Sequence, residues 1–137
     1  MTADPVLSVE GLSVRFDLEG PSFEVLRGID FQVEKGRTLC LVGESGCGKS
    51  ITAMAILGLL PKRARVARGA VRFEGTDLVA MPERALRNRR GGKIGMIFQE
   101  PMTSLNPTMT AGEQITEGLR IHLRMSIMSV RTHRGWQ

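Results

Sequence analysis

The sequence predicts an α/β domain in which antiparallel strands at the front precede parallel core strands with helices. Three observations support this fold class. Residues 6–16 and 28–36 alternate between apolar and polar side chains, as half-buried strands do. Residues 38–42 form a short apolar run, as expected for a parallel strand buried on both faces. A glycine-rich loop and a helical segment follow this run, so strands and helices alternate from there onward.

The front strands are predicted from their alternation and from one glycine. In residues 6–16 the alternation is interrupted at Gly11, which predicts a β-bulge there. In residues 28–36 the apolar side chains fall on one face. In the run 38–42 we expect Cys40 to act as a small core hydrophobe.

The middle of the chain predicts a helix, a linker and a strand. Residues 50–60 are helical in pattern, and Pro61 ends the helix. A basic stretch at 62–69 is expected to be a linker, and residues 70–75 are expected to be a short strand.

The last third predicts two helices around one strand. Pro82 suits the first turn of a helix that the glycine pair after residue 90 ends. Residues 93–99 predict a strand, closed by a polar loop. Thr110 and Glu113 form a capping box that opens a helix, and one face of this helix is apolar, with Ile115, Leu119 and Leu123.

Composition and charge narrow the class of protein. Hydrophobic residues make up 42% and charged residues 24%, which is ordinary for a globular domain. The N-terminus shows no secretory signal and no apolar run reaches membrane-spanning length, so we expect synthesis in the cytosol. In that compartment the two cysteines predict neither a disulfide nor a zinc site.

The basic charge is uneven and raises the question of nucleic acid. Ten of the 19 Lys and Arg fall between residues 62 and 93, together with three acidic residues. Phe73 is the only aromatic residue in that stretch, so no row of stacking side chains accompanies the charge. A solvated face near an anionic ligand or a membrane is the favoured interpretation, and no nucleic-acid partner is expected.

The strongest motif is GESGCGKS at residues 43–50, which matches the phosphate loop G-x-x-x-x-G-K-[ST] between a strand and a helix. Its glycines let consecutive backbone N–H groups turn toward phosphate oxygens at the positive end of a helix. Lys49 is expected to reach the β- and γ-phosphates, and the Ser50 hydroxyl to bind Mg²⁺. The predicted nucleotide-binding residues of the loop are Gly43, Glu44, Ser45, Gly46, Cys47, Gly48, Lys49, Ser50 and Ile51.

Many proteins share this loop, so further residues are needed to choose among them. A P-loop kinase and a basic regulatory or nucleic-acid-binding module remain alternatives at this point. The stretch IGMIFQEPMTSLNPTMTAGEQI follows the loop by about fifty residues, and Phe16 ends the first predicted strand. Together with GESGCGKS, these residues resemble the ATP-binding subunits of ABC transporters, in the branch that imports oligopeptides, dipeptides or nickel. The resemblance covers residues 6–122.

The resemblance implies a P-loop NTPase fold of the ABC nucleotide-binding type, with ATP and Mg²⁺ as ligands. It implies that Phe16 stacks on adenine and that Gln99 contacts Mg²⁺ and the attacking water, so that Gln99 and Lys49 are the candidate catalytic residues. It further implies integral-membrane permease subunits and a second ATP-binding subunit, in a homodimer or heterodimer, as partners. The location implied is cytoplasmic, peripheral on the inner face of the plasma membrane, where ATP hydrolysis powers import of a peptide or a related small solute.

Parts of the family pattern are absent from the sequence. No LSGGQ-type signature occurs, no apolar strand ends in Asp followed by the catalytic Glu, and neither His122 nor His133 has the context of the switch histidine. We therefore expect residues 1–123 to be the N-terminal part of the ATP-binding domain. Residues 124–137 are expected to be a disordered tail foreign to the family.

A truncated fragment of this kind should bind ATP without hydrolysing it. A frameshift, a deliberate truncation and a true short variant all remain open, and the sequence does not identify the transported solute. The residues that a second half would cover, in 38–42 and 93–99, should then expose apolar surface and a strand edge.

Overall fold

The computed structural model describes residues 4–17, 19–99 and 105–123. Its elements are β1 (Leu7–Phe16), β2 (Phe23–Val33), α1 (Lys49–Ile56), β3 (Ala64–Phe73), β4 (Thr76–Asp77), α2 (Glu83–Arg89) and α4 (Ala111–Leu123). The chain divides into two units, Met1–Leu86 and Arg87–Gln137. The tail predicted at 124–137 lies outside the described residues.

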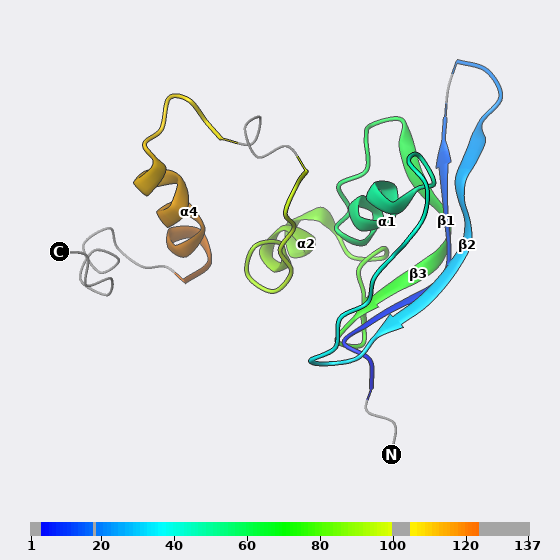
Figure 1. Cartoon of the computed structure of the whole chain (residues 1–137), viewed down its shortest axis with the longest axis horizontal. Coiled ribbons are helices and arrows are strands. Elements are labelled where there is room, and N and C mark those ends of the chain that lie inside the picture. The colour runs from blue at the N-terminus through cyan, green and yellow to red at the C-terminus, as the bar shows by residue number, and fades with distance from the viewer. Residues whose placement is uncertain (1–3, 18, 100–104, 124–137) are drawn as a thin grey trace. The chain divides into compact units, whose positions relative to one another are not determined.

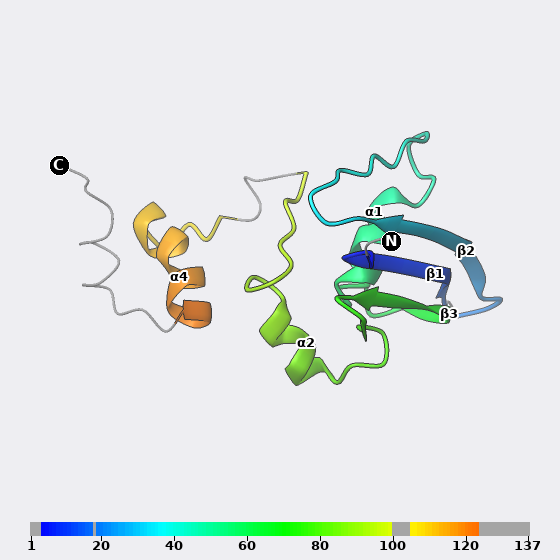
Figure 2. The same cartoon turned by 90° about the horizontal axis from the view of Figure 1, so that it is seen from below.

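The first unit contains an antiparallel sheet with strand order β2-β1-β3-β4. Figure 1 labels its three long strands, β1, β2 and β3, and shows that the sheet is curved. The central strand β1 pairs with β2 on one edge and with β3 on the other, as the view from below also shows (Figure 2). α1 lies against the sheet through its buried residues Thr52 and Ala55. The largest buried apolar side chains of the strands are Val9, Leu12, Val14, Leu26 and Val71.

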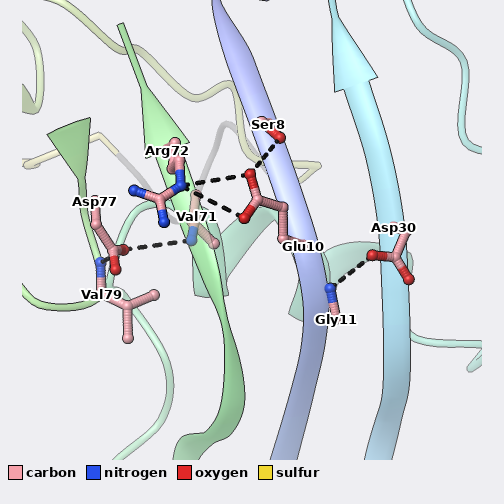
Figure 3. A network of polar contacts seen from close by, with 8 residues as sticks. All are labelled: Ser8, Glu10, Gly11, Asp30, Val71, Arg72, Asp77 and Val79. Carbon is pink, nitrogen blue, oxygen red and sulfur yellow. Dashed lines mark hydrogen bonds and ion pairs between the residues drawn. The ribbon is translucent and has the colours of Figure 1, made fainter. Parts of the chain in front are cut away.

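Both predicted front strands are present and the bulge is confirmed, but the second strand, β2, covers Phe23–Val33 instead of the predicted 28–36. The pairing of β1 with β2 shifts register between Val9 and Leu12, and Gly11 has a left-handed φ of 56°. The amide of Gly11 donates to Asp30 Oδ1 on β2 at 2.7 Å, so the interrupted ladder still satisfies that donor (Figure 3).

The basic stretch at 62–69 is mostly strand rather than linker, which corrects the prediction, because β3 begins at Ala64. Three arginines of β3 pair with acidic residues, one on β1, one on β2 and one directly after β1. Arg65 Nε lies 2.6 Å from Asp17 Oδ2, and Arg68 Nη2 lies 3.2 Å from Glu24 Oε1. Arg72 Nε lies 3.4 Å from Glu10 Oε1, beside the Ser8 hydroxyl that also donates to this carboxylate (Figure 3). Cross-strand pairing of this kind allows a positively charged sequence to form a strand.

The two parallel core strands predicted at 38–42 and 93–99 are not formed, although the helices and sheet of the α/β class are present. Residues 38–42 form no strand, and the only pairing in 93–99 is an isolated parallel bridge between Arg90 and Ile94. A parallel strand needs neighbouring strands along its edges, and the described residues place none beside these runs.

The apolar surface expected from these two runs is observed. The exposed side chains include Leu39, Leu41, Val42, Ile97 and Phe98, and Val42 is 93% exposed. Cys40 is also exposed, so its predicted role as a core residue is wrong.

The second unit confirms the capping box that opens α4. The backbone N–H and hydroxyl of Thr110 donate to Glu113 Oε2 at 2.9 and 2.8 Å, and the Glu113 amide donates to Thr110 Oγ1 at 3.3 Å. The two hydrogen bonds that Glu113 accepts from Thr110 lower the pKa of its exposed carboxyl group, and the one from the backbone N–H has the larger effect. The predicted apolar face of α4 is not covered, since none of its residues is buried.

Candidate functional site: a phosphate loop beside an aromatic pair

The glycine-rich loop at 43–50 leads directly into α1, which begins at Lys49. Gly46 and Gly48 have φ angles of 82° and 98°, in the left-handed region that favours glycine. Gly48 caps α1 without any side-chain hydrogen bond at that end. The first turn of α1 therefore presents backbone N–H groups at the positive end of the helix, which is the arrangement that binds anions.

The Lys49 side chain folds back into the loop. Its ammonium donates to the carbonyl oxygens of Gly43 and Glu44, both at 2.6 Å, and lies 3.4 Å from Cys47 Sγ. An ammonium group has three protons, so these contacts engage all of them. Lys49 thus ties the start of the loop to the start of the helix and places a positive charge inside the loop.

Close packing fixes where the loop lies against the sheet. A Cβ added at Gly48 would come within 2.5 Å of Leu26 Cδ2 and 3.6 Å of the Val25 carbonyl oxygen on β2. A Cβ at Gly43 would come within 2.6 Å of Cys47 Sγ. Gly48 therefore needs glycine for close approach to the buried Leu26, in addition to its backbone conformation. At Gly43 the contact is with the end of the exposed Cys47 side chain, which can rotate.

Phe16 lies at the end of β1 and stacks on Phe23 at the start of β2. The ring centroids are 5.7 Å apart and the rings are inclined by 11°. Phe16 is half-buried and Phe23 is 47% exposed. The sequence alone did not single out Phe23. Its position just after the turn that follows Phe16 could have indicated it, because residues that flank a hairpin turn pair across the strands.

The aromatic pair and the loop contact lie on the same face of the sheet. Val14 and Phe16 are two residues apart on β1, so their side chains share a face. Leu26, which contacts Gly48, is the register partner of Val14 on β2. The Val14–Leu26 and Phe16–Phe23 pairs are therefore two residues, about 6.8 Å, apart along β1. Along β2 they are three residues apart, because the register shifts between Val14 and Arg15.

The remaining predicted residues are placed as follows. Ser50 is exposed in the first turn of α1 and Ile51 is half-buried. Glu44 and Ser45 are exposed in the loop. Gln99 is exposed and belongs to the second unit, so its proximity to the loop stays a prediction.

The part of the chain that the structure describes contains neither a cluster of metal ligands nor a membrane-spanning helix. No group of three or more His, Cys, Asp or Glu side chains able to hold a metal occurs in residues 4–17, 19–99 and 105–123. Over the same ranges, no helix has the length and apolar character needed to cross a bilayer.

Comparison with known proteins agrees with these features. The sequence profile described as "ABC transporter" matches residues 26–135. The chain is 46% identical over 129 residues to the dipeptide transport ATP-binding protein DppD of Bacillus subtilis, covering 93% of this chain and 38% of that protein. It is 49% identical over 122 residues to the oligopeptide transport ATP-binding protein OppD of the same organism, covering 88% of this chain and 34% of OppD.

A solved structure gives the same fold. The dimeric ATP-binding cassette MJ0796 bound to ADP and Pi aligns with a TM-score of 0.79 at 23% identity, over 92% of this chain and 53% of its own. The chain spans 38% and 34% of the lengths of DppD and OppD. The resemblance inferred from the two sequence motifs is confirmed, and the chain belongs to the ABC transporter family.

Proposed function

We propose that the chain binds ATP with Mg²⁺ through residues 43–50, as part of the nucleotide-binding subunit of a peptide importer. The observation that supports this most strongly is the position of the Lys49 ammonium, 2.6 Å from two carbonyl oxygens of the loop at the N-terminus of α1. A structural turn between a loop and a helix needs no cation there. A phosphate-binding loop does, because the cation compensates the charge of the β- and γ-phosphates.

The contacts of Lys49 suggest how a phosphate would be accommodated. The two carbonyl contacts are short, whereas the contact with Cys47 Sγ is long and sulfur is a weak acceptor. Exchange of the sulfur contact for a phosphate oxygen would keep the loop tied at Gly43 and Glu44. The ammonium can therefore bind an anion without giving up the two bonds that shape the loop.

The residues present also suit Mg²⁺. This ion keeps several waters and takes one or two protein ligands together with substrate phosphates, so a cluster of carboxylates is not required. The exposed Ser50 hydroxyl follows Lys49 in the first turn of α1 and would supply such a ligand. Bound Mg²⁺ would neutralise part of the phosphate charge, and Gln99 is proposed to contact it and the attacking water.

The relatives' names support the biological setting. DppD and OppD are dipeptide and oligopeptide transport ATP-binding proteins. On this basis we propose that the solute is a peptide or a related small molecule. The proposed partners are integral-membrane permease subunits and a second ATP-binding subunit, which places the protein at the cytoplasmic face of the membrane.

We further propose that residues 1–137 by themselves bind ATP without turning it over. Lys49 and Ser50 would position the phosphates and the metal, together with Gln99 in the role proposed above. Residues 1–137 contain neither the Glu that would orient the attacking water nor the signature loop that a second subunit would receive. Positioning and general-base assistance supply much of the rate in this chemistry. Steady phosphate release that survives purification and disappears in Lys49→Ala would overturn this proposal.

One of the alternative functions loses its main support. Part of the basic stretch 62–93 that suggested nucleic acid lies in β3, where Arg65, Arg68 and Arg72 are paired with carboxylates. Their charge is thereby compensated within the sheet, which argues against a surface dedicated to phosphate backbones.

The test of the proposed function compares ATP with inorganic triphosphate, using Phe16→Ala. A base stacked on an aromatic ring contributes about 1–3 kcal/mol, which corresponds to a loss of about 5- to 150-fold in affinity for ATP. Binding of triphosphate, which has no base, should stay unchanged. An equal loss for both ligands would show that Phe16 only supports the fold.

A further inference from the structure

The face of the sheet opposite its buried core carries a cleft of about 600 Å³. Ser8 and Glu10 flank the buried Val9 along β1, so their side chains lie on the face opposite to that of Val9. The volume is within the range of small-molecule sites. We call this cleft the outer cleft, and its charged and amide side chains come from β1, β2, β3 and the residues that flank them: Asp4, Glu10, Gln32, Lys35, Arg72 and Glu74.

A row of polar side chains crosses the sheet within the outer cleft. Gln32 of β2 and Arg72 of β3 are both register partners of Ser8 on β1. Arg72 Nε lies 3.4 Å from each carboxylate oxygen of Glu10, and the Ser8 hydroxyl donates to Glu10 Oε1 at 3.0 Å (Figure 3). The charge of Glu10 is therefore compensated within the sheet. Both Nη groups of Arg72 and the Gln32 amide keep their hydrogen-bonding capacity, since neither has a partner within the described residues.

Charges of both signs border the outer cleft without pairing with each other. Lys35 lies in the turn after β2, Glu74 lies in the turn after β3, and Asp4 precedes β1. These three side chains form no ion pair or hydrogen bond within residues 4–17, 19–99 and 105–123. β2 and β3 lie on either side of β1, about 9.6 Å apart, and this spacing separates Lys35 from Glu74. A ligand with a charge at each end would bridge that separation.

Glu74 occupies a position where its residue type is uncommon. It is the first of the two residues in the hairpin turn between β3 and β4, where Phe73 pairs with Thr76. Such turns favour Asn, Asp or Gly, and Glu74 is the only non-glycine residue with a positive φ, 48°, in the part of the chain that the structure describes. The Glu74 amide donates to the Val6 carbonyl oxygen at 3.0 Å, which fixes the turn beside β1. The turn thus holds a carboxylate at the border of the outer cleft.

We propose that the outer cleft binds a short peptide of about three residues, which lies across the strands. Its carboxylate pairs with Lys35, its ammonium group pairs with Glu74 and Asp4, and its peptide groups bind the Gln32 amide and the Arg72 Nη groups. Three residues of extended chain span about 10 Å, which matches the spacing of β2 and β3. This inference goes beyond the proposed function and does not depend on it, because the outer cleft contains no residue of the phosphate loop.

The test is an NMR titration of the isotope-labelled whole chain with tri-alanine. The wild type should show saturable shifts of the backbone amides of Ser8, Gln32 and Glu74. Acetylation of the peptide's amino end, or amidation of its carboxyl end, should each weaken binding about 3- to 10-fold, as expected for the loss of one hydrogen-bonded contact. Absence of saturable binding, or equal affinity for a peptide blocked at both ends, would overturn the inference.

Variants assign each end of the peptide to its partner. Lys35→Gln should weaken binding of tri-alanine about 3- to 10-fold but leave binding of the amidated peptide unchanged, because that peptide has no carboxylate to lose. The matched control is Arg37→Gln, which removes a nearby exposed charge outside the outer cleft and should change neither affinity. Glu74→Asn, which suits the turn, should weaken binding of tri-alanine but not of the acetylated peptide. Equal losses in Lys35→Gln and Arg37→Gln would show that only net charge matters and would refute the site.

The same variants separate this inference from the proposed function. Lys49→Ala should bind tri-alanine like the wild type, and Lys35→Gln should bind Mg-ATP like the wild type. If the wild type binds Mg-ATP but not tri-alanine, the outer cleft alone is wrong. If it binds tri-alanine but not Mg-ATP, the proposed nucleotide site alone is wrong.

Discussion

Replacing Gly48 by alanine should both destabilise the fold and displace the phosphate loop. The residue has a φ of 98°, and the left-handed region costs a residue with a Cβ about 1–2 kcal/mol. The new methyl group would also lie 2.5 Å from Leu26 Cδ2, and Leu26 is 2% exposed and has little room to move. Overpacking of a buried position costs about 1–3 kcal/mol. The free energy of unfolding should therefore fall by about 2–5 kcal/mol.

Gly46→Ala is the matched control for this prediction. Its φ of 82° imposes a similar backbone cost, but a Cβ at Gly46 meets no atom within 4 Å. Urea unfolding followed by circular dichroism should show a loss of only about 1–2 kcal/mol for Gly46→Ala. Shortening the neighbour in Gly48→Ala/Leu26→Val should recover part of the difference. Equal destabilisation by the two alanine variants, with no recovery, would refute the proposed packing of the loop on β2.

Two further predictions concern the loop and the second unit. Alkylation of Cys47 should block ATP binding, because its sulfur lies beside Lys49 in the loop. Mg-ATP should protect Cys47 from alkylation but leave the exposed Cys40 unprotected, as measured by mass spectrometry of the modified peptides. Equal protection of both thiols would contradict this prediction. The hydrogen bonds from Thr110 lower the pKa of Glu113. Their contribution to the stability of α4 is therefore fully present at pH values above the ordinary carboxyl pKa, and it is lost as the pH falls through the lowered pKa. Thr110→Val should raise the Glu113 pKa toward its ordinary value in an NMR titration, and an unchanged pKa would show that the hydroxyl does not contribute.

Local signals in the sequence predicted several elements well. The bulge at Gly11, the start of a helix after the glycine-rich loop and the capping box at Thr110 each depend on residues within a few positions of one another. The close packing of Gly48 against Leu26 was not predicted, because it depends on a strand that is distant in sequence. Motifs of this kind encode backbone conformation directly, so a single sequence is sufficient to find them.

Features that depend on distant residues were missed or misplaced. The basic residues from Ala64 onward resemble a linker until Asp17 and Glu24 are brought beside them by strand pairing. The apolar run 38–42 has strand character, but strand formation depends on neighbours that its own sequence does not specify. Phe16 pairs with Phe23 on β2 and with Ala64 on β3. These pairings depend on the register of two strand pairs, which only the folded sheet defines.

The most direct test of the central claim is equilibrium binding of Mg-ATP to the whole chain and to Lys49→Ala. A hydrogen bond to a charged group contributes about 1.5–3 kcal/mol, so removal of the ammonium should weaken ATP binding about 10- to 150-fold. Triphosphate affinity should fall by a similar factor, because Lys49 is proposed to contact the phosphates rather than the base. Saturable binding by the wild type that is lost in Lys49→Ala for both ligands is the predicted result. Equal affinity of the two proteins for Mg-ATP would contradict the assignment of residues 43–50 as the nucleotide site.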